Sequence, residues 1–221
     1  MVQRRSDRDP PPDLLTSLIQ SVDPDTGEAM NDQQICAELV TFMLAGHETT
    51  ANTLTWALYL LSMAPEVRRR LERELEAPEP VPQGLCDRVI SETLRLYPPA
   101  WQFGRRSLQA DRLRGYDIGP EQDIVVSPYV LHRHPEYWPN PEGFDPDRFL
   151  VDIPKGAFVP FAAGPRQCIG NHFALFEARL ILSTIVRTVR LNLAPGYRAV
   201  PEAMITLRPK GGMPMTLEVR G

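Results

Sequence analysis

The sequence has few cysteines and no closely spaced pair of them. Its three cysteines are Cys36, Cys86 and Cys168, and no two stand in a Cys-x-x-Cys arrangement. An odd number without such a pair indicates neither a disulfide framework nor a zinc site. Each cysteine therefore has to be assessed from its own surroundings.

The sequence also has no excess of positive charge and no basic run interleaved with aromatic residues. Its 24 Lys and Arg and 28 Asp and Glu give a formal net charge of −4, which argues against a nucleic-acid partner. No signal peptide is visible, and the charged stretch from Met1 to Asp13 is no membrane segment. A cytoplasmic location is therefore the default expectation. With 43% hydrophobic and 24% charged residues, the composition is that of a globular chain with a substantial core.

One cysteine lies in a short, glycine-containing loop that leads into a helix. From Phe161 to Gly170 the sequence reads Phe-Ala-Ala-Gly-Pro-Arg-Gln-Cys-Ile-Gly, and the apolar spacing after it predicts a helix over about residues 169–187. Unpaired N–H groups and the positive end of the helix dipole favour the thiolate of a cysteine placed just before a helix. Gly164 and Gly170 allow a flat ligand to approach the backbone, and Arg166 is placed to pair with a carboxylate of that ligand. A thiolate that binds haem iron axially has these requirements.

A second, longer segment is predicted to be a buried helix. Asn31 and Gln34 form a capping-box pattern and Pro65 blocks continuation, which predicts a helix over about residues 32–64. At this length it spans about 50 Å. Its middle, from Val40 to Leu61, is apolar nearly all round and is expected to be buried.

A polar segment, Ala-Gly-His-Glu-Thr-Thr from Ala45 to Thr50, interrupts this apolar helix. These residue types are poor choices for a buried helix interior. Taken alone, the segment favours a structural interpretation in which the threonines bond back to carbonyls one turn earlier. His47 and Glu48 suggest a zinc protease helix, but Ala51 stands where that motif requires a second histidine.

The cysteine loop resembles the haem-binding loop of the cytochrome P450 monooxygenases, whose pattern is Phe-x-x-Gly-x-Arg-x-Cys-x-Gly. The alternative, a free cysteine in an ordinary loop, does not explain five matched residues at fixed spacing. The family usually has Gly or Ser after the phenylalanine, and Ala162 is a small residue that is expected to change little sterically. The resemblance implies that Cys168 is the axial ligand of haem b, with these residues around the cofactor: Phe161, Gly164, Arg166 and Gly170.

The polar segment of the long helix is similar to the oxygen-binding groove of the same family. The resemblance places the acid at Glu48 and the hydroxyl at Thr49. Reduction of O2 to the point of O–O cleavage consumes two protons, so these two residues are expected to relay protons. His47 falls at a variable position and has no expected role.

Two more motifs resemble those of the family and follow in its order. Glu92 and Arg95 match a Glu-x-x-Arg pair, and Arg148, in Phe-Asp-Pro-Asp-Arg-Phe, matches its third partner. These three are expected to form a buried charged network that fixes the loop under the haem. The resemblance also implies that Arg105 holds a haem propionate, although Arg106 stands beside it, and that the substrate pocket is bordered by Ala100, Trp101 and Phe103.

The remaining segments predict short elements. Residues 1–12 are expected to be frayed, residues 77–82 are a proline-rich linker, and His132 and His134 are interpreted as a helix end rather than a metal site. Further helices are predicted at 14–19, 65–76 and 85–97. Strands are predicted at 101–107, 113–118 and 124–127, and a small C-terminal sheet at 191–193, 205–207 and 216–219, with a turn at 203–205 near substrate.

The expected fold is mainly α with small β-sheets, and residues 1–221 are expected to form the C-terminal half of a single cytochrome P450 domain whose N-terminal half is absent. The implied function is a haem-thiolate monooxygenase that inserts one atom of O2 into a small apolar organic substrate. A separate ferredoxin or flavin reductase would supply the electrons. One alternative is an inactive remnant or one half of a split haem protein. A peroxide-driven enzyme is a weaker alternative, because it would not need Glu48 and Thr49.

Overall fold

The computed structural model describes residues 2–77, 81 and 83–220, and it is helical with small sheets, as the sequence predicts. The chain divides into two compact units, Met1–Glu48 and Thr49–Gly221, and each is described by itself. Residues 78–80 and 82 of the predicted linker lie outside the described residues.

The first unit contains helices α1 (Val2–Ser6) and α2 (Leu14–Gln20) and the beginning of α3 (Asp32–Met63). The expectation that residues 1–12 are frayed is wrong for α1. Arg4 pairs with Asp13 at 2.7 Å and Arg5 pairs with Asp32 at 2.9 Å, so two ion pairs hold a helix that lacks an apolar face. The predicted capping box before α3 is present, with Gln34 N–H donating to Asn31 Oδ1 at 2.9 Å and Asn31 N–H donating to Gln34 Oε1 at 2.8 Å.

Helix α3 has the bounds that the sequence predicts, but less of it is buried than the sequence predicts. Trp56, Ala57 and Leu61 are fully buried, whereas the side chains of Met43 and Leu44 are exposed. The expectation of burial along the whole apolar stretch is therefore wrong for its first part. An apolar pattern shows that side chains avoid water, and it does not show which part of a chain covers them.

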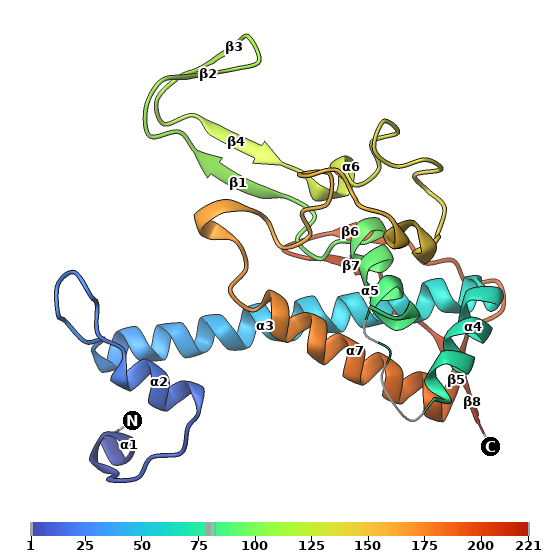
Figure 1. Ribbon diagram of the computed structural model, residues 1–221, viewed down its shortest axis with the longest axis horizontal. Coiled ribbons are helices and arrows are strands. Elements are labelled where there is room, and N and C mark those ends of the chain that lie inside the picture. Colours follow the sequence, from blue (N-terminus) through green and yellow to red (C-terminus); the bar gives the residue numbers. More distant parts are fainter. Residues whose placement is uncertain (1, 78–80, 82, 221) are drawn as a thin grey trace. The chain divides into compact units, whose positions relative to one another are not determined.

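In the second unit, the core lies between α3 and three further helices, α4 (Pro65–Leu75), α5 (Leu85–Leu96) and α7 (Asn171–Thr188) (Figure 1). Helix α5 packs against both α4 and α7, and α4 also packs against α7. The buried apolar side chains are Ala57, Leu61, Leu71, Leu85, Cys86, Val89, Ile90, Leu94, Ala178, Leu182 and Val186. This core gives α7, which follows the cysteine loop, a fixed position in its unit.

A smaller aromatic cluster joins α3 to the C-terminal part of the chain. The rings of Trp56 and Tyr97 stack with their centroids 4.0 Å apart, and Trp56 Nε1–H donates to the carbonyl of Leu207 at 3.1 Å. Leu207 N–H in turn donates to the carbonyl of Pro99 at 3.0 Å. The segment after α5 and the last hairpin are therefore held against the same stretch of α3.

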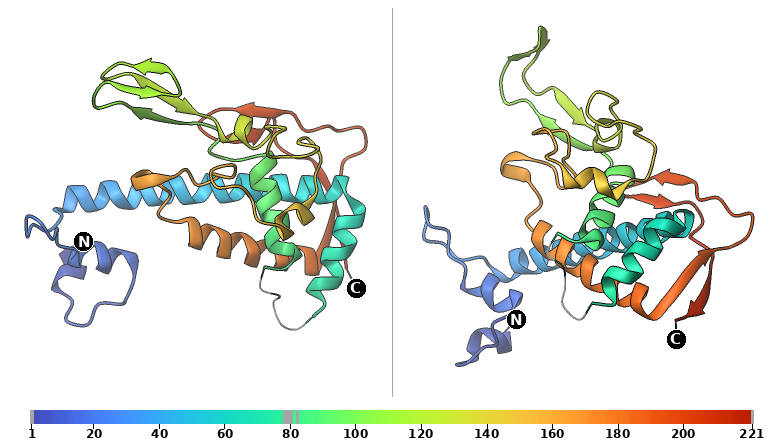
Figure 2. Two further views of the ribbon diagram at one scale, coloured as in Figure 1. Left: turned by 45° about the horizontal axis from the view of Figure 1, so that its top comes forward. Right: turned by 45° about the vertical axis from the view of Figure 1, so that its right-hand side comes forward.

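Four two-stranded antiparallel sheets are formed by the described residues (Figure 2). The strands are β1 (Phe103–Arg106) with β4 (Asp123–Val126), β2 (Asp111–Leu113) with β3 (Tyr116–Ile118), β5 (Val189–Leu193) with β8 (Met215–Val219), and β6 (Pro201–Ala203) with β7 (Leu207–Pro209).

Two strand predictions need correction. The strand expected over 113–118 is a hairpin, because Arg114 (φ 46°) and Gly115 (φ 91°) turn the chain back. The single C-terminal sheet expected is two separate sheets. Three short helical segments complete the fold, α6 (Pro128–Leu131), η1 (Pro146–Leu150) and η2 (Gly164–Arg166).

Candidate functional site

The cysteine loop is closed by a main-chain hydrogen bond. Cys168 N–H donates to the carbonyl of Phe161 at 3.0 Å, and Gln167 N–H donates to the carbonyl of Gly164, also at 3.0 Å. Phe161 packs against the helical core, so the base of the loop is anchored while the Cys168 side chain is exposed. Helix α7 begins two residues beyond Ile169, with Gly170 as its N-cap. The loop therefore presents a thiol near the start of a helix, as the sequence indicates.

The backbone of this loop shows which of its small residues are required. Gly164 has φ +76°, a left-handed conformation that suits glycine. Gly170 has φ −90°, and a Cβ there would meet only Cys168 Sγ, at 4.0 Å, so the chain itself does not demand glycine at this position. Ala162 has φ +59°, which its Cβ disfavours. The expectation that alanine changes little at this position is therefore wrong.

Exposed apolar side chains follow Cys168 along the chain into α7. Ile169 is 84% exposed and Phe173 is 67% exposed, and Phe176 continues the same stripe one turn later. A single cysteine can complete a haem site because the porphyrin supplies four nitrogen ligands of its own. An exposed thiol on an anchored loop, followed along the chain by exposed apolar side chains, would suit a ligand to the iron of an apolar cofactor. The residues present therefore fit haem.

Arg105 and Arg106 have different surroundings, although they are neighbours on β1. Arg106 makes a two-pronged ion pair with Asp123 of β4, at 2.8 and 2.9 Å, and the Asp123 carboxylate raises the pKa of its guanidinium. Arg105 Nη2–H donates to the carbonyl of Ala163 at 3.3 Å, in the cysteine loop. The pairing of Arg106 with Asp123 leaves Arg105 as the better candidate for a carboxylate of a ligand held by that loop. Arg166 is exposed on the loop itself.

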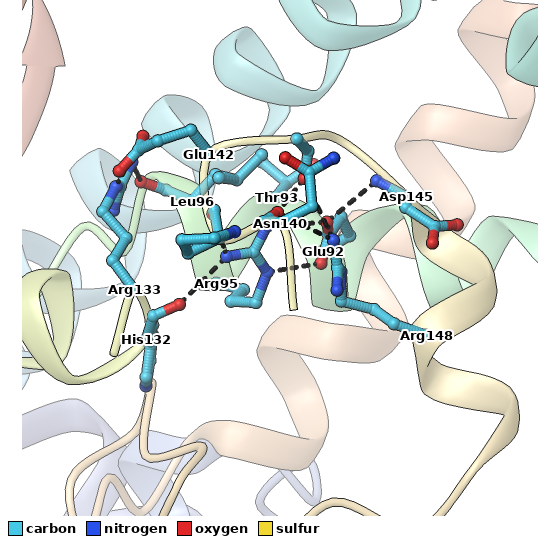
Figure 3. A network of polar contacts seen from close by, with 12 residues as sticks. Glu92, Thr93, Arg95, Leu96, His132, Arg133, Asn140, Glu142, Asp145 and Arg148 are labelled. Carbon is cyan, nitrogen blue, oxygen red and sulfur yellow. Dashed lines mark hydrogen bonds and ion pairs between the residues drawn. The ribbon is translucent and has the colours of Figure 1, made fainter. Parts of the chain in front are cut away.

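The structure brings Glu92, Arg95 and Arg148 together in a buried network (Figure 3). Arg95 donates to both carboxylate oxygens of Glu92, at 2.7 and 2.8 Å, and Arg148 Nε–H donates to Glu92 Oε1 at 3.1 Å. The remaining donors of Arg95 bond the carbonyls of His132, Pro141 and Gly143, so all five of its N–H groups have partners. The network fixes the irregular segment that precedes the cysteine loop.

Sequence reasoning missed a role for His132, which it interpreted only as the end of a helix. Its side chain is fully buried, and its Nε2 accepts a hydrogen bond from Val159 N–H at 2.9 Å. Its carbonyl accepts from Arg95 Nη1 at 2.9 Å. No sequence pattern indicates these contacts, because the partners are 27 and 37 residues away along the chain.

Glu48 and Thr49 lie on either side of the division between the two units, within the continuous helix α3. Both side chains are half-buried. One turn later, Thr53 Oγ1 donates to the carbonyl of Thr49 at 2.9 Å. The predicted role of Glu48 and Thr49 in proton transfer remains a prediction.

The described part of the chain offers neither a cluster of metal-ligating side chains nor a membrane-spanning helix. No group of three or more His, Cys, Asp and Glu side chains there is arranged to hold a metal ion. No helix among those residues is both long and apolar enough to cross a lipid bilayer.

Comparison with known families gives a match over residues 1–214 to the family model described as cytochrome P450. Two proteins of Streptomyces melanosporofaciens are each 40% identical to the chain. Cyclooctatin synthase matches over 88% of this chain and 45% of its own length. Cyclooctat-9-en-7-ol 5-monooxygenase matches over 94% of this chain and 48% of its own length.

Solved structures of cytochrome P450 heme domains also match the chain. The crystal structure of the cytochrome P450DA heme domain matches all of this chain and 51% of its own, with a TM-score of 0.90 and 31% identity. The chain thus spans about half the length of the relatives that it matches.

Proposed function

The chain belongs to the cytochrome P450 family, and we propose that it forms the haem-binding part of a monooxygenase in which Cys168 is the axial thiolate ligand. The observation that carries this proposal is the exposed Cys168 thiol on a loop that is closed at Phe161 and anchored in the core. Haem, when bound, supplies the iron at which O2 is reduced and one oxygen atom is transferred to substrate.

The loop and its neighbours have separate roles in this proposal. The Cys168 sulfur would hold the iron of the cofactor as a thiolate. Arg105 and Arg166 bind the carboxylates of the cofactor, and Arg105 also ties β1 to the loop through the Ala163 carbonyl. Gly164 supplies the left-handed backbone that the loop needs. The network of Glu92, Arg95 and Arg148 holds in place the irregular segment that precedes the cysteine loop.

Proton delivery is assigned to Glu48 and Thr49. A carboxyl group and a hydroxyl group next to each other in a helix can pass protons through a short relay, with water as the intermediate carrier. Thr49 is the better placed of the two to be held rigidly, because its carbonyl already accepts a hydrogen bond from Thr53 one turn later. We assign no role to His47.

The substrate is proposed to be a small apolar organic molecule. Trp101 lies just before β1, and Phe103 is the first residue of that strand. Trp101 Nε1–H donates to the carbonyl of Met204, at 2.9 Å, in the turn between β6 and β7. Ile205 in that turn is 93% exposed. These apolar side chains come from two segments that are tied together. Cyclooctat-9-en-7-ol 5-monooxygenase names a cyclic alcohol as its substrate, and we propose a substrate of comparable apolar character here.

Electrons are proposed to come from a separate ferredoxin or flavin reductase, as in the expectation drawn from the sequence.

A second candidate follows from the exposed apolar side chains of α7. Phe173, Phe176 and Leu180 are more than half exposed, and exposed apolar stripes of this kind mark surfaces that another polypeptide segment covers. In this candidate the 221 residues hold haem only together with the other half of the family fold. Haem titration of the chain alone separates the two candidates.

The test of the first candidate compares two exposed cysteines. Cys168→Ala is expected to abolish stoichiometric haem binding and the thiolate spectrum. Cys36→Ala, at the other exposed cysteine, is expected to leave haem binding and the spectrum unchanged. Equal spectra for the two variants would contradict the proposal.

In turnover with ¹⁸O2, Thr49→Ala is expected to lose O2-driven oxidation and to retain peroxide-driven oxidation, because peroxide brings its own protons. Retention of O2-driven oxidation in Thr49→Ala would contradict the proton relay, and a wild-type chain that oxidises substrate only with peroxide would support the peroxide-driven alternative.

A further inference from the structure

His132 makes hydrogen bonds with two parts of the second unit that are far apart along the chain. Its main-chain carbonyl faces Arg95 in the buried network, and its ring extends away from that network (Figure 3). Its ring nitrogen Nε2 accepts a hydrogen bond from Val159 N–H at 2.9 Å. One residue thus connects the Glu92–Arg95 pair to the segment that enters the cysteine loop.

From Val159, two more hydrogen bonds lead to the ligand residue. The carbonyl of Val159 accepts from Ala162 N–H at 3.1 Å, which sets the left-handed turn at Ala162. The carbonyl of Phe161 accepts from Cys168 N–H at 3.0 Å. A displacement of Val159 therefore changes the base of the loop from which Cys168 projects.

The chemistry of the ring requires a neutral histidine. A nitrogen that accepts a hydrogen bond carries no proton, so the ring proton is on Nδ1. Nδ1 is buried and has no hydrogen-bond partner among the described residues. Burial lowers the pKa of His132 to about 4, and the cations of Arg95 and Arg133 act in the same direction, so the ring stays neutral near pH 7.

The surroundings also hold the ring in one orientation. Its centroid is 5.1 Å from that of Phe158 and 6.4 Å from that of Trp138, and it has no solvent exposure. An apolar side chain of similar size would fill this space equally well. The polar atom at Nε2 is therefore explained by its acceptance of the Val159 N–H, which would otherwise be a buried donor without a partner.

We propose that His132 is a positioning residue for Cys168, which transmits the rigidity of the Glu92–Arg95 network to the cysteine loop through the Val159 N–H. This inference rests on the proposed function only for its consequence at the haem. The part of the proposal that concerns the conformation of the loop can be tested in the chain without haem.

The test uses two amide variants that differ by one methylene group. The side-chain oxygen of His132→Gln reaches approximately the place of Nε2 and can accept the Val159 N–H. The shorter side chain of His132→Asn cannot reach it. Both replace an aromatic ring by an amide, so they differ in packing by only one methylene group. Exchange in α5, which does not depend on the Val159 hydrogen bond, controls for that difference.

The first readout is amide hydrogen exchange in the chain without haem. His132→Asn is expected to accelerate exchange at Val159 and Cys168 on the order of tenfold relative to His132→Gln, with Leu94 and Val89 in α5 exchanging alike in the two variants. Equal exchange at Val159 and Cys168 in both variants, or uniform acceleration over α5, would overturn the proposal. Should either variant fail to fold, the wild-type chain decides, because an unprotected Val159 amide there contradicts the proposal and a protected one supports it.

The second readout is spectroscopic. With haem and carbon monoxide, His132→Asn is expected to shift part of the reduced protein from the thiolate to the neutral-thiol spectrum, and His132→Gln to restore the thiolate form. The same thiolate fraction in both variants would overturn the role at the ligand. A wild-type chain that binds no haem contradicts the proposed function alone, because the exchange readout does not involve haem.

Discussion

Arg95 donates from Nε and Nη2 to the two carboxylate oxygens of Glu92, at 2.7 and 2.8 Å, and neither side chain has any exposure to solvent. The same spacing of Glu and Arg, three residues apart, occurs at Glu66 and Arg69 on α4, where the side chains are 77% and 60% exposed. Burial therefore distinguishes a network that orders a distant loop from an ordinary surface ion pair.

The buried pair predicts a large effect of its removal. Arg95→Leu leaves the Glu92 carboxylate with Arg148 as its remaining cation. It also removes the Arg95 donor from the carbonyls of His132 and Pro141, and leaves the Gly143 carbonyl with only Arg148 Nη2, at 3.4 Å. We expect a loss of about 3–5 kcal/mol in the free energy of unfolding. Arg69→Leu, the matched control, should change it by less than about 1 kcal/mol. Denaturant unfolding followed by circular dichroism measures both, and similar losses would refute the distinction.

The conformation of Ala162 predicts a stabilising substitution. At φ +59° the Cβ of alanine is strained, so Ala162→Gly is expected to stabilise the chain by about 1 kcal/mol. Ala163 has an extended backbone at φ −154°, so Ala163→Gly should bring no gain. Thermal unfolding of the two variants is the measurement. A lower melting temperature for Ala162→Gly than for the wild-type chain would show that the left-handed turn is not formed.

The three cysteines are expected to differ in reactivity. Burial, with the charges of Asp87 and Glu74, raises the pKa of the Cys86 thiol to about 12, and the thiolate is the reactive form. Iodoacetamide should therefore modify the exposed Cys36 and Cys168 in the native chain and Cys86 only after denaturation. Haem should protect Cys168 and leave Cys36 reactive, as peptide mass spectrometry can show. Equal protection of both cysteines would argue against a specific ligand.

The buried neutral ring of His132 predicts an acid-dependent loss of stability. The folded chain binds this proton only near pH 4, whereas the unfolded chain binds it near the ordinary pKa of 6.5. The free energy of unfolding should therefore fall as the pH drops from about 6.5 to about 4, with a loss of about 3 kcal/mol at most from this group. His132→Gln lacks the titration, so its stability should decline less over that window. Parallel pH profiles for the two chains would contradict the account.

The long helices could be predicted because their signals are local. The Asn31–Gln34 capping box and Pro65 mark the two ends of α3 within about one residue, and the apolar spacing after Gly170 marks α7. The contact between Glu92 and Arg148 followed only from resemblance to a family, because 56 residues separate them.

Features that depend on distant or conformational detail could not be predicted. The exposure of Leu44 depends on what covers the helix, which periodicity does not encode. The hairpin at Arg114 and the turn at Ala162 depend on left-handed backbone at residues that are not glycine. The hydrogen bond from Val159 to His132 leaves no trace in the spacing of either residue.

The central claim is that Cys168 binds haem iron as a thiolate, and the carbon monoxide difference spectrum of the dithionite-reduced chain tests it most directly. The chain expressed with haem available is expected to show a strongly red-shifted Soret band that Cys168→Ala lacks and Cys36→Ala retains. A band typical of histidine or neutral-thiol ligation, or the same band in the Cys168→Ala variant, would contradict the claim.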